Sequence, residues 1–99
     1  MSEPQWWVAA IGDLLVWARL VEDDEGIAEV LDSDGRVIRY DDVTTARMAL
    51  LDAEFRAFDG LDEDDAARLG FDLDETEPPR GDSDEELLPG MIQKLPPRH

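Results

Sequence analysis

A predicted strand that runs directly into a long amphipathic helix constrains the fold more than any other feature of this sequence. Residues 37–40 read Val-Ile-Arg-Tyr, a composition typical of strands. Asp41 and Asp42 follow and can cap a helix, because their short side chains accept hydrogen bonds from the free N–H groups of a first helical turn. Residues 43–58 contain no Gly or Pro, and Gly60 can end the helix in a left-handed conformation. The pattern predicts one long helix over residues 43–58.

Three more strands are predicted before this unit. They cover residues 6–11, 14–22 and 27–31, which are rich in Trp, Val, Ile and Leu and are separated by turn-forming Gly and Asp residues. Tight turns of this kind join consecutive strands into an antiparallel meander. The sequence therefore predicts an α+β fold: a three- to four-stranded antiparallel meander followed by one long and one short helix, with an acidic C-terminal tail.

The predicted second strand is apolar on both faces. Leu14, Val16, Ala18 and Leu20 share one face, and the other face is also mostly apolar although it carries Arg19. A single long helix covers only one of these faces. We expect the other face to be covered by the second helix, the C-terminal segment, a second copy of the chain or a partner.

The second helix is predicted to be short. Asp62 can cap it, residues 63–69 form it and Gly70 ends it. Leu61 before the cap and Ala66 after it have the spacing of a hydrophobic staple, which fixes the direction in which the chain enters a helix.

The composition changes after residue 71. Residues 72–86 are rich in Asp and Glu and contain two consecutive prolines, which is typical of a solvated linker. We predict a compact α+β domain over residues 1–71 and an acidic, proline-containing linker over residues 72–99. A short apolar segment near the end either docks back onto the sheet or binds another molecule. Its apolar residues are Leu87, Leu88, Met91, Ile92 and Leu95.

Charge narrows the range of partners. The chain has 26 acidic and 9 basic residues, a net charge of −17. Direct binding to nucleic acid or to an anionic membrane surface requires a cationic patch, so neither is expected. A basic protein, in contrast, would be attracted from a distance. The sequence has no cysteine, no apolar stretch long enough to span a membrane and no secretory signal, and we expect a cytoplasmic protein.

The sequence offers no arrangement of residues for catalysis. Its one histidine is the last residue, His99, so a Ser-His-Asp or Cys-His arrangement is not expected. The glycines are scattered singly rather than gathered in a phosphate-binding loop. Asp-x-Asp pairs recur, but none is followed by the Gly and Glu that a calcium-binding EF-hand loop requires. We predict no enzyme, no cofactor and no dedicated metal site.

The chain is therefore expected to act by contact. We predict a small acidic binding or inhibitory protein that docks on a basic surface of a partner protein, including a surface that normally holds DNA or RNA, as a nucleic-acid mimic or an immunity protein would. One alternative is a small dimeric adaptor or structural domain, with a homodimer formed through the second face of the sheet. Another is a halophile-type cytosolic protein whose acidity serves solubility alone. The candidate partner-binding residues are Asp23, Asp24, Glu25, Asp62, Glu63, Asp64, Asp65, Trp7, Trp17, Leu87, Leu88, Met91 and Ile92.

Overall fold

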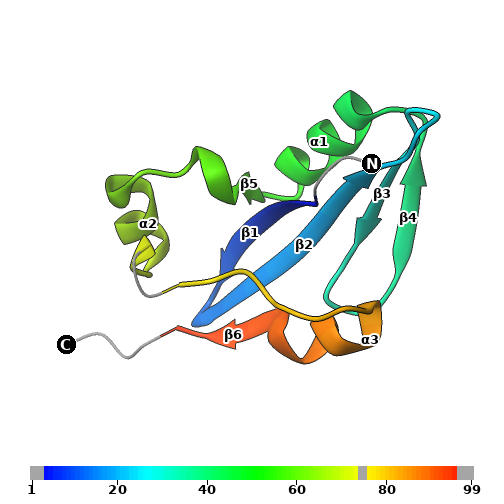
Figure 1. Cartoon of the computed structure of the whole chain (residues 1–99). Helices are drawn as coiled ribbons and strands as arrows, with labels where there is room; N and C mark the ends of the chain where they lie inside the picture. The colour runs from blue at the N-terminus through cyan, green and yellow to red at the C-terminus, as the bar shows by residue number, and fades with distance from the viewer. Residues whose placement is uncertain (1–3, 74–75, 96–99) are drawn as a thin grey trace.

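The structure is a computed structural model, and it describes residues 4–73 and 76–95. Over these residues it is an α+β fold built on one antiparallel sheet, as predicted (Figure 1). The strands are β1 (Gln5–Ile11), β2 (Leu14–Glu22), β3 (Ala28–Leu31), β4 (Val37–Tyr40), β5 (Arg56–Ala57) and β6 (Ile92–Lys94). The helices are α1 (Val43–Asp52), α2 (Glu63–Leu69) and α3 (Asp84–Leu87), with 3-10 turns η1 (Phe58–Gly60) and η3 (Leu88–Gly90).

The first four strands form the predicted meander. The sheet order is β4-β3-β2-β1-β5, and each of the first four strands pairs with its neighbour in sequence. Glycine makes the tight connections possible, since Gly12, Gly26 and Gly35 all have positive φ values, which side chains with a Cβ rarely adopt. The β2–β3 and β3–β4 turns are built alike, because Asp23 and Asp32 each accept hydrogen bonds from the backbone N–H groups two and four residues later.

Helix α1 is shorter than the sequence pattern predicts. It ends at Asp52, and Glu54 adopts a left-handed conformation with φ 69°. The N–H of Phe55 then bonds to the carbonyl of Leu50 at 2.9 Å, and the N–H of Glu54 bonds to the carbonyl of Leu51 at 3.0 Å. These two bonds form a Schellman motif, which closes a helix and turns the chain away. The prediction of one helix over residues 43–58 was wrong because a glutamate fills the position where glycine is the usual signal.

Two short strands extend the sheet beyond the predicted meander. After the Schellman motif the chain returns as β5 and pairs with β1 through Trp7 and Ala57. Near the C-terminus β6 pairs with β2 through Val16 and Ile92. Both strands are too short for an alternation of apolar and polar residues to be recognised in the sequence. Only their backbone pairing with β1 and β2 identifies them as strands.

Helix α2 has the predicted bounds and both predicted caps. The Asp62 carboxylate accepts a hydrogen bond from the N–H of Asp65 at 2.8 Å, and the Asp65 carboxylate accepts one from the N–H of Asp62 at 3.4 Å. This reciprocal pair is a capping box. Gly70 ends the helix with φ 98°.

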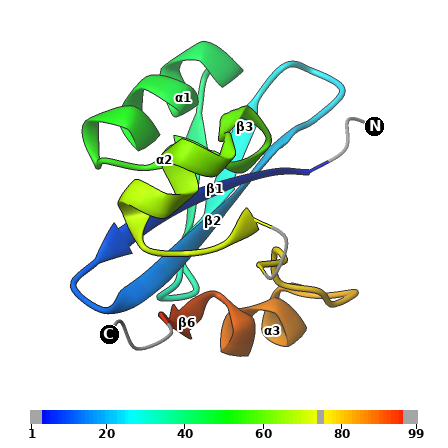
Figure 2. The ribbon, with the colours of Figure 1, turned by 90° about the vertical axis from the view of Figure 1, so that its left-hand side faces the viewer.

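The strands β1, β2 and β3 carry buried side chains on both faces of the sheet, and different elements cover each face, whereas Val37, Ile38 and Arg39 of β4 are exposed. On one face Ala46 and Leu50 of α1 pack over Ala18, Leu20 and Val30, together with Trp7 and Ala28. On the other face Ala66, Phe71, Leu87 and Met91 pack over Val8, Leu15, Trp17 and Leu31. Figure 2 shows the arrangement edge-on, with α1 on one side of the sheet and α3 on the other.

The C-terminal segment lies against this second face. The N–H of Trp17 donates to the carbonyl of Met91 at 2.8 Å, and the N–H of Leu95 donates to the carbonyl of Asp13 at 2.8 Å. An ion pair joins Arg19 Nη2 on β2 to Asp84 Oδ1 on α3 at 2.8 Å. The segment over residues 76–95 therefore shares a core with the sheet. The division of the chain into two regions at residue 71 stays a prediction.

Candidate functional site

Most charged groups lie on the surface rather than in the core; Arg19 differs, with a side chain that is 19% exposed and a buried Nε atom. Among the described residues, none of the buried side chains is polar or charged. A carboxylate taken out of water shifts its pKa and can act as an acid or base, whereas a solvated carboxylate acts mainly through its charge. The carboxylates of this molecule are therefore expected to act through their charge, and their arrangement on the surface determines where that charge is concentrated.

Six carboxylates gather at one end of the sheet, which we call the acidic end. They belong to residues 22–25, in the β2–β3 connection, and to Asp41 and Asp42, between β4 and α1. Glu22 pairs with Ala28 across β2 and β3, and Ala28 pairs with Tyr40 across β3 and β4, so the two segments lie at the same end of the sheet. Neither segment contains an arginine or lysine.

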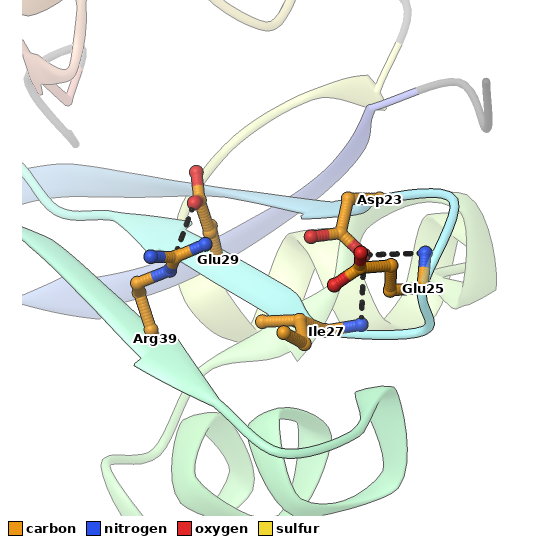
Figure 3. A network of polar contacts seen from close by, with 5 residues as sticks. All are labelled: Asp23, Glu25, Ile27, Glu29 and Arg39. Atoms are coloured by element: carbon orange, nitrogen blue, oxygen red, sulfur yellow. Dashed lines mark hydrogen bonds and ion pairs between the residues drawn. The ribbon is translucent and has the colours of Figure 1, made fainter.

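The β2–β3 turn at the acidic end is held by its own first residue. Figure 3 shows one carboxylate oxygen of Asp23 accepting hydrogen bonds from the N–H groups of Glu25 at 2.9 Å and Ile27 at 3.0 Å. The same view shows Arg39 Nε on β4 paired with Glu29 Oε1 on β3 at 3.2 Å. Arg39 of β4 is thus paired within the sheet, and residues 22–25 of the turn are all acidic.

Asp42 is one of the carboxylates of the acidic end and is also the N-cap residue of α1. Its Oδ1 atom accepts a hydrogen bond from the N–H of Thr45 at 2.7 Å and so caps α1. Hydrogen bonds from Thr45, first from the backbone N–H and then from the side chain, lower the pKa of Asp42, because they favour the charged form. Asp42 therefore stays ionised to lower pH than an ordinary aspartate.

The second group of predicted acidic residues lies elsewhere. Asp62, Glu63, Asp64 and Asp65 occupy the cap and first turn of α2, where negative charge is favoured by the helix dipole. Figure 1 shows α2 at the opposite end of the molecule from the β2–β3 turn, and the molecule measures 47 × 25 × 21 Å. The structure does not bring this group together with residues 23–25.

Four of the six apolar candidates are buried and do not reach a partner in this structure. Trp7 is 4% exposed, Trp17 and Met91 are 0% exposed, and Leu87 is 4% exposed. Trp17 packs against Trp6 and Phe58 with ring centroids 6.1 and 5.1 Å apart. Leu88 is half-buried, and Ile92 is 46% exposed.

Sequence reasoning missed two features of the surface. The sequence pattern identifies Asp41 and Asp42 only as helix caps, although the predicted order of the third and fourth strands places them beside the β2–β3 turn. The second feature is a groove between α1, β5 and α2. Its position depends on the early end of α1, for which the sequence shows no glycine signal.

Comparison with known proteins assigns no family. No family model matches the chain, and neither the curated proteins nor the solved structures contain a match.

Metal binding and membrane crossing can each be examined over the described residues. Across residues 4–73 and 76–95, no cluster of His, Asp or Glu side chains is arranged to hold a metal ion. No helix in the same part of the chain has the length and apolar character needed to cross a membrane.

Proposed function

We propose that the protein binds a basic surface of a partner protein through its acidic end. The observation that carries this proposal is the juxtaposition of residues 22–25 with Asp41 and Asp42, without an arginine or lysine in either segment. Exposed charges of one sign focus the electrostatic field and speed the encounter with a partner of the opposite sign.

A nucleic-acid-binding protein is the class of partner that the charge density favours. B-DNA of the same 47 Å length would carry about 28 negative charges, at one charge per about 1.7 Å. The net charge of −17 is about three-fifths of that number. A groove built to hold phosphates would thus meet a comparable, though lower, density of negative charge on this protein.

The proposal is tested by capture from a host lysate at low salt, followed by measurement of the affinity of the captured partner. The double variant Glu25→Gln/Asp41→Asn removes two carboxylates from the acidic end. The matched control, Asp52→Asn/Asp59→Asn, removes two exposed carboxylates elsewhere, so both variants have the same net charge. We expect the partner to bind the control nearly as well as the parent and to bind the first variant several-fold more weakly.

The salt dependence provides a second criterion. Affinity for a basic partner should fall steeply as salt rises from low to physiological concentration, because salt screens exposed charges. A partner that binds equally well at both concentrations, or that fails to distinguish the two variants, would show that the acidic end is not the contact surface.

A further inference from the structure

A groove of about 470 Å³ lies where α1, β5 and α2 meet. Its size falls within the range of roughly 300–1,000 Å³ that is typical of ligand-binding sites. Its large apolar lining residues are Trp7, Leu51, Leu61 and Leu69. Trp7 forms a rigid, buried part of this surface, whereas Leu51 is 47% exposed. The groove therefore offers apolar contact area that water currently covers.

The charge of this groove is opposite to that of the molecule. Arg56 and Arg68 line it together with a single carboxylate, that of Asp65, so its charged side chains sum to +1 in a chain of net charge −17. Within residues 4–73 and 76–95 neither arginine forms an ion pair, and the Nη1 atom of Arg56 donates to the carbonyl of Phe55 at 2.9 Å. Asp65 is already used in the capping box of α2. Both guanidinium groups thus have N–H donors available.

The backbone beside the groove is held in an uncommon conformation. Glu54, two residues before Arg56, has a left-handed backbone with φ 69°. A left-handed conformation is less favourable for a residue with a Cβ than for glycine. The turn at Glu54 places Arg56 on β5, at the wall of the groove, instead of continuing α1. Such local strain is frequent at functional sites, and here it lies next to the groove.

We propose that this groove binds a peptide segment of a partner protein in which an apolar side chain is flanked by carboxylates. The apolar side chain packs against Leu51, Leu61 and Leu69, beside the buried Trp7 ring, and the carboxylates accept hydrogen bonds from Arg56 and Arg68. Arginine suits this role because its planar guanidinium can bind a carboxylate through two parallel hydrogen bonds. A purely apolar peptide would cover the guanidinium groups without pairing them, which is unfavourable. A purely anionic ligand would leave the apolar surface unused.

This site is independent of the acidic end and has the opposite salt dependence. An acidic peptide is repelled at long range by a net charge of −17, and salt screens that repulsion. We therefore expect affinity for such a peptide to hold or rise between low and physiological salt. Affinity for a basic partner at the acidic end should fall over the same range, so the failure of either proposal can be told from the failure of the other.

A peptide display library selected on the full chain tests the proposal. We expect enriched peptides to contain Leu, Ile or Phe next to Asp or Glu. On binding, they should shift the NMR signals of the Trp7 indole N–H and of the Ala57 amide, both of which belong to groove residues. Selection of no peptide, or of basic peptides, would overturn the proposal.

Matched variants locate the binding. Arg56→Gln/Arg68→Gln removes both cations from the groove, and Arg36→Gln/Arg47→Gln removes two exposed arginines elsewhere, so the change in net charge is the same. We expect the groove variant to weaken peptide binding about tenfold or more and the control to change it by less than about threefold. Leu51→Glu, which places a carboxylate in the groove at an exposed position, should also abolish binding. Equal effects of the two arginine pairs would overturn the proposal.

A second copy of the chain is the competing occupant. If it fills the groove, the parent should sediment as a dimer without peptide, and Arg56→Gln/Arg68→Gln should sediment as a monomer. That result would overturn the proposal of a partner peptide. Thermal unfolding of every variant, compared with the parent, verifies that the loss of binding is not a loss of folding.

Discussion

At the scale of single residues, Glu54 shows how a side chain can occupy a position that favours glycine. Its left-handed backbone closes α1 through the same type of hydrogen bond that closes α2, where the N–H of Phe71 bonds to the carbonyl of Ala66 at 3.0 Å. In α2 the left-handed residue is Gly70. The two helices thus end alike, and only one of them carries the usual sequence signal.

We expect Glu54→Gly to raise the free energy of unfolding by about 0.5–1 kcal/mol. Glycine relieves the left-handed strain, and its greater freedom in the unfolded chain offsets part of the gain. The control is Ala53→Gly, since Ala53 has φ −88° and gains nothing from glycine. It should lower stability. Urea unfolding measures both variants, and a loss of stability in Glu54→Gly would show that the Glu54 side chain stabilises this turn.

Asp42 caps helix α1 through its side chain, and this cap should contribute to stability. Asp42→Ala should lower the Tm at neutral pH because the N–H of Thr45 loses its acceptor. The neighbouring Asp41 is exposed and its side chain makes no cap in this structure, so Asp41→Ala should change the Tm little. Thermal unfolding monitored by circular dichroism makes this comparison.

The effect of Asp42 should depend on pH in a definite direction. Its pKa is lower in the folded chain than in the unfolded chain, so its contribution to stability is fully present above the unfolded value and is lost as pH falls through the folded value. The Tm difference between the parent and Asp42→Ala should therefore be constant at neutral pH and shrink below about pH 4. A difference that grows on acidification would contradict the capping role.

At the scale of elements, the C-terminal segment acts as the cover of one sheet face. Its apolar residues differ in burial. Leu87 and Met91 lie in the core, whereas Ile92 on β6 is 46% exposed. The Arg19–Asp84 ion pair and the backbone bond from Trp17 to Met91 fix its position on β2. The C-terminal segment therefore buries apolar side chains on the second face of β2 within the same chain.

Met91→Ala measures how much this cover contributes. Met91 is fully buried, so its truncation should destabilise the chain by about 2–5 kcal/mol. The adjacent control Ile92→Ala removes an exposed side chain from the same segment and should cost less than about 1 kcal/mol. If the two variants are equally stable in urea, the segment does not share the core of the sheet in solution.

At the scale of the whole molecule, the carboxylates lie around the outside of a core built on both faces of the central strands. The segments that cover these strands come from the same chain, and the molecule is 47 Å long. Like charges at this density repel one another and oppose the compact state.

We expect the Tm to rise with sodium chloride. Most of the rise should occur below about 0.15 M, because the screening length falls from about 30 Å at 0.01 M to about 8 Å at that concentration. Sucrose at matched osmolarity is the control that does not screen charge. A Tm that instead climbs steadily into molar salt would indicate a chain adapted to high salt, and an unchanged Tm would show that the surface charges do not repel appreciably.

The local parts of this fold could be predicted from sequence because their signals are local. The four strands of the meander follow from their high content of apolar and aromatic residues and from turns with Gly and Asp, and α2 follows from its cap and Gly70. The acidic end could have been found from the same signals, since the order of two adjacent strands places Asp41 and Asp42 beside residues 23–25.

The remaining parts depend on contacts between residues far apart in the chain. The strands β5 and β6 exist because β1 and β2 offer them free edges, and the end of α1 at Asp52 depends on how Phe55 packs with Leu50 on the sheet. The groove depends in turn on that early end. The sequence by itself determined the antiparallel meander and the excess of negative charge, because these follow from neighbouring residues and from composition. Only the tertiary structure decided which segments cover each face and where two arginines meet an apolar surface, because burial is a property of the packed chain and not of any one stretch of it.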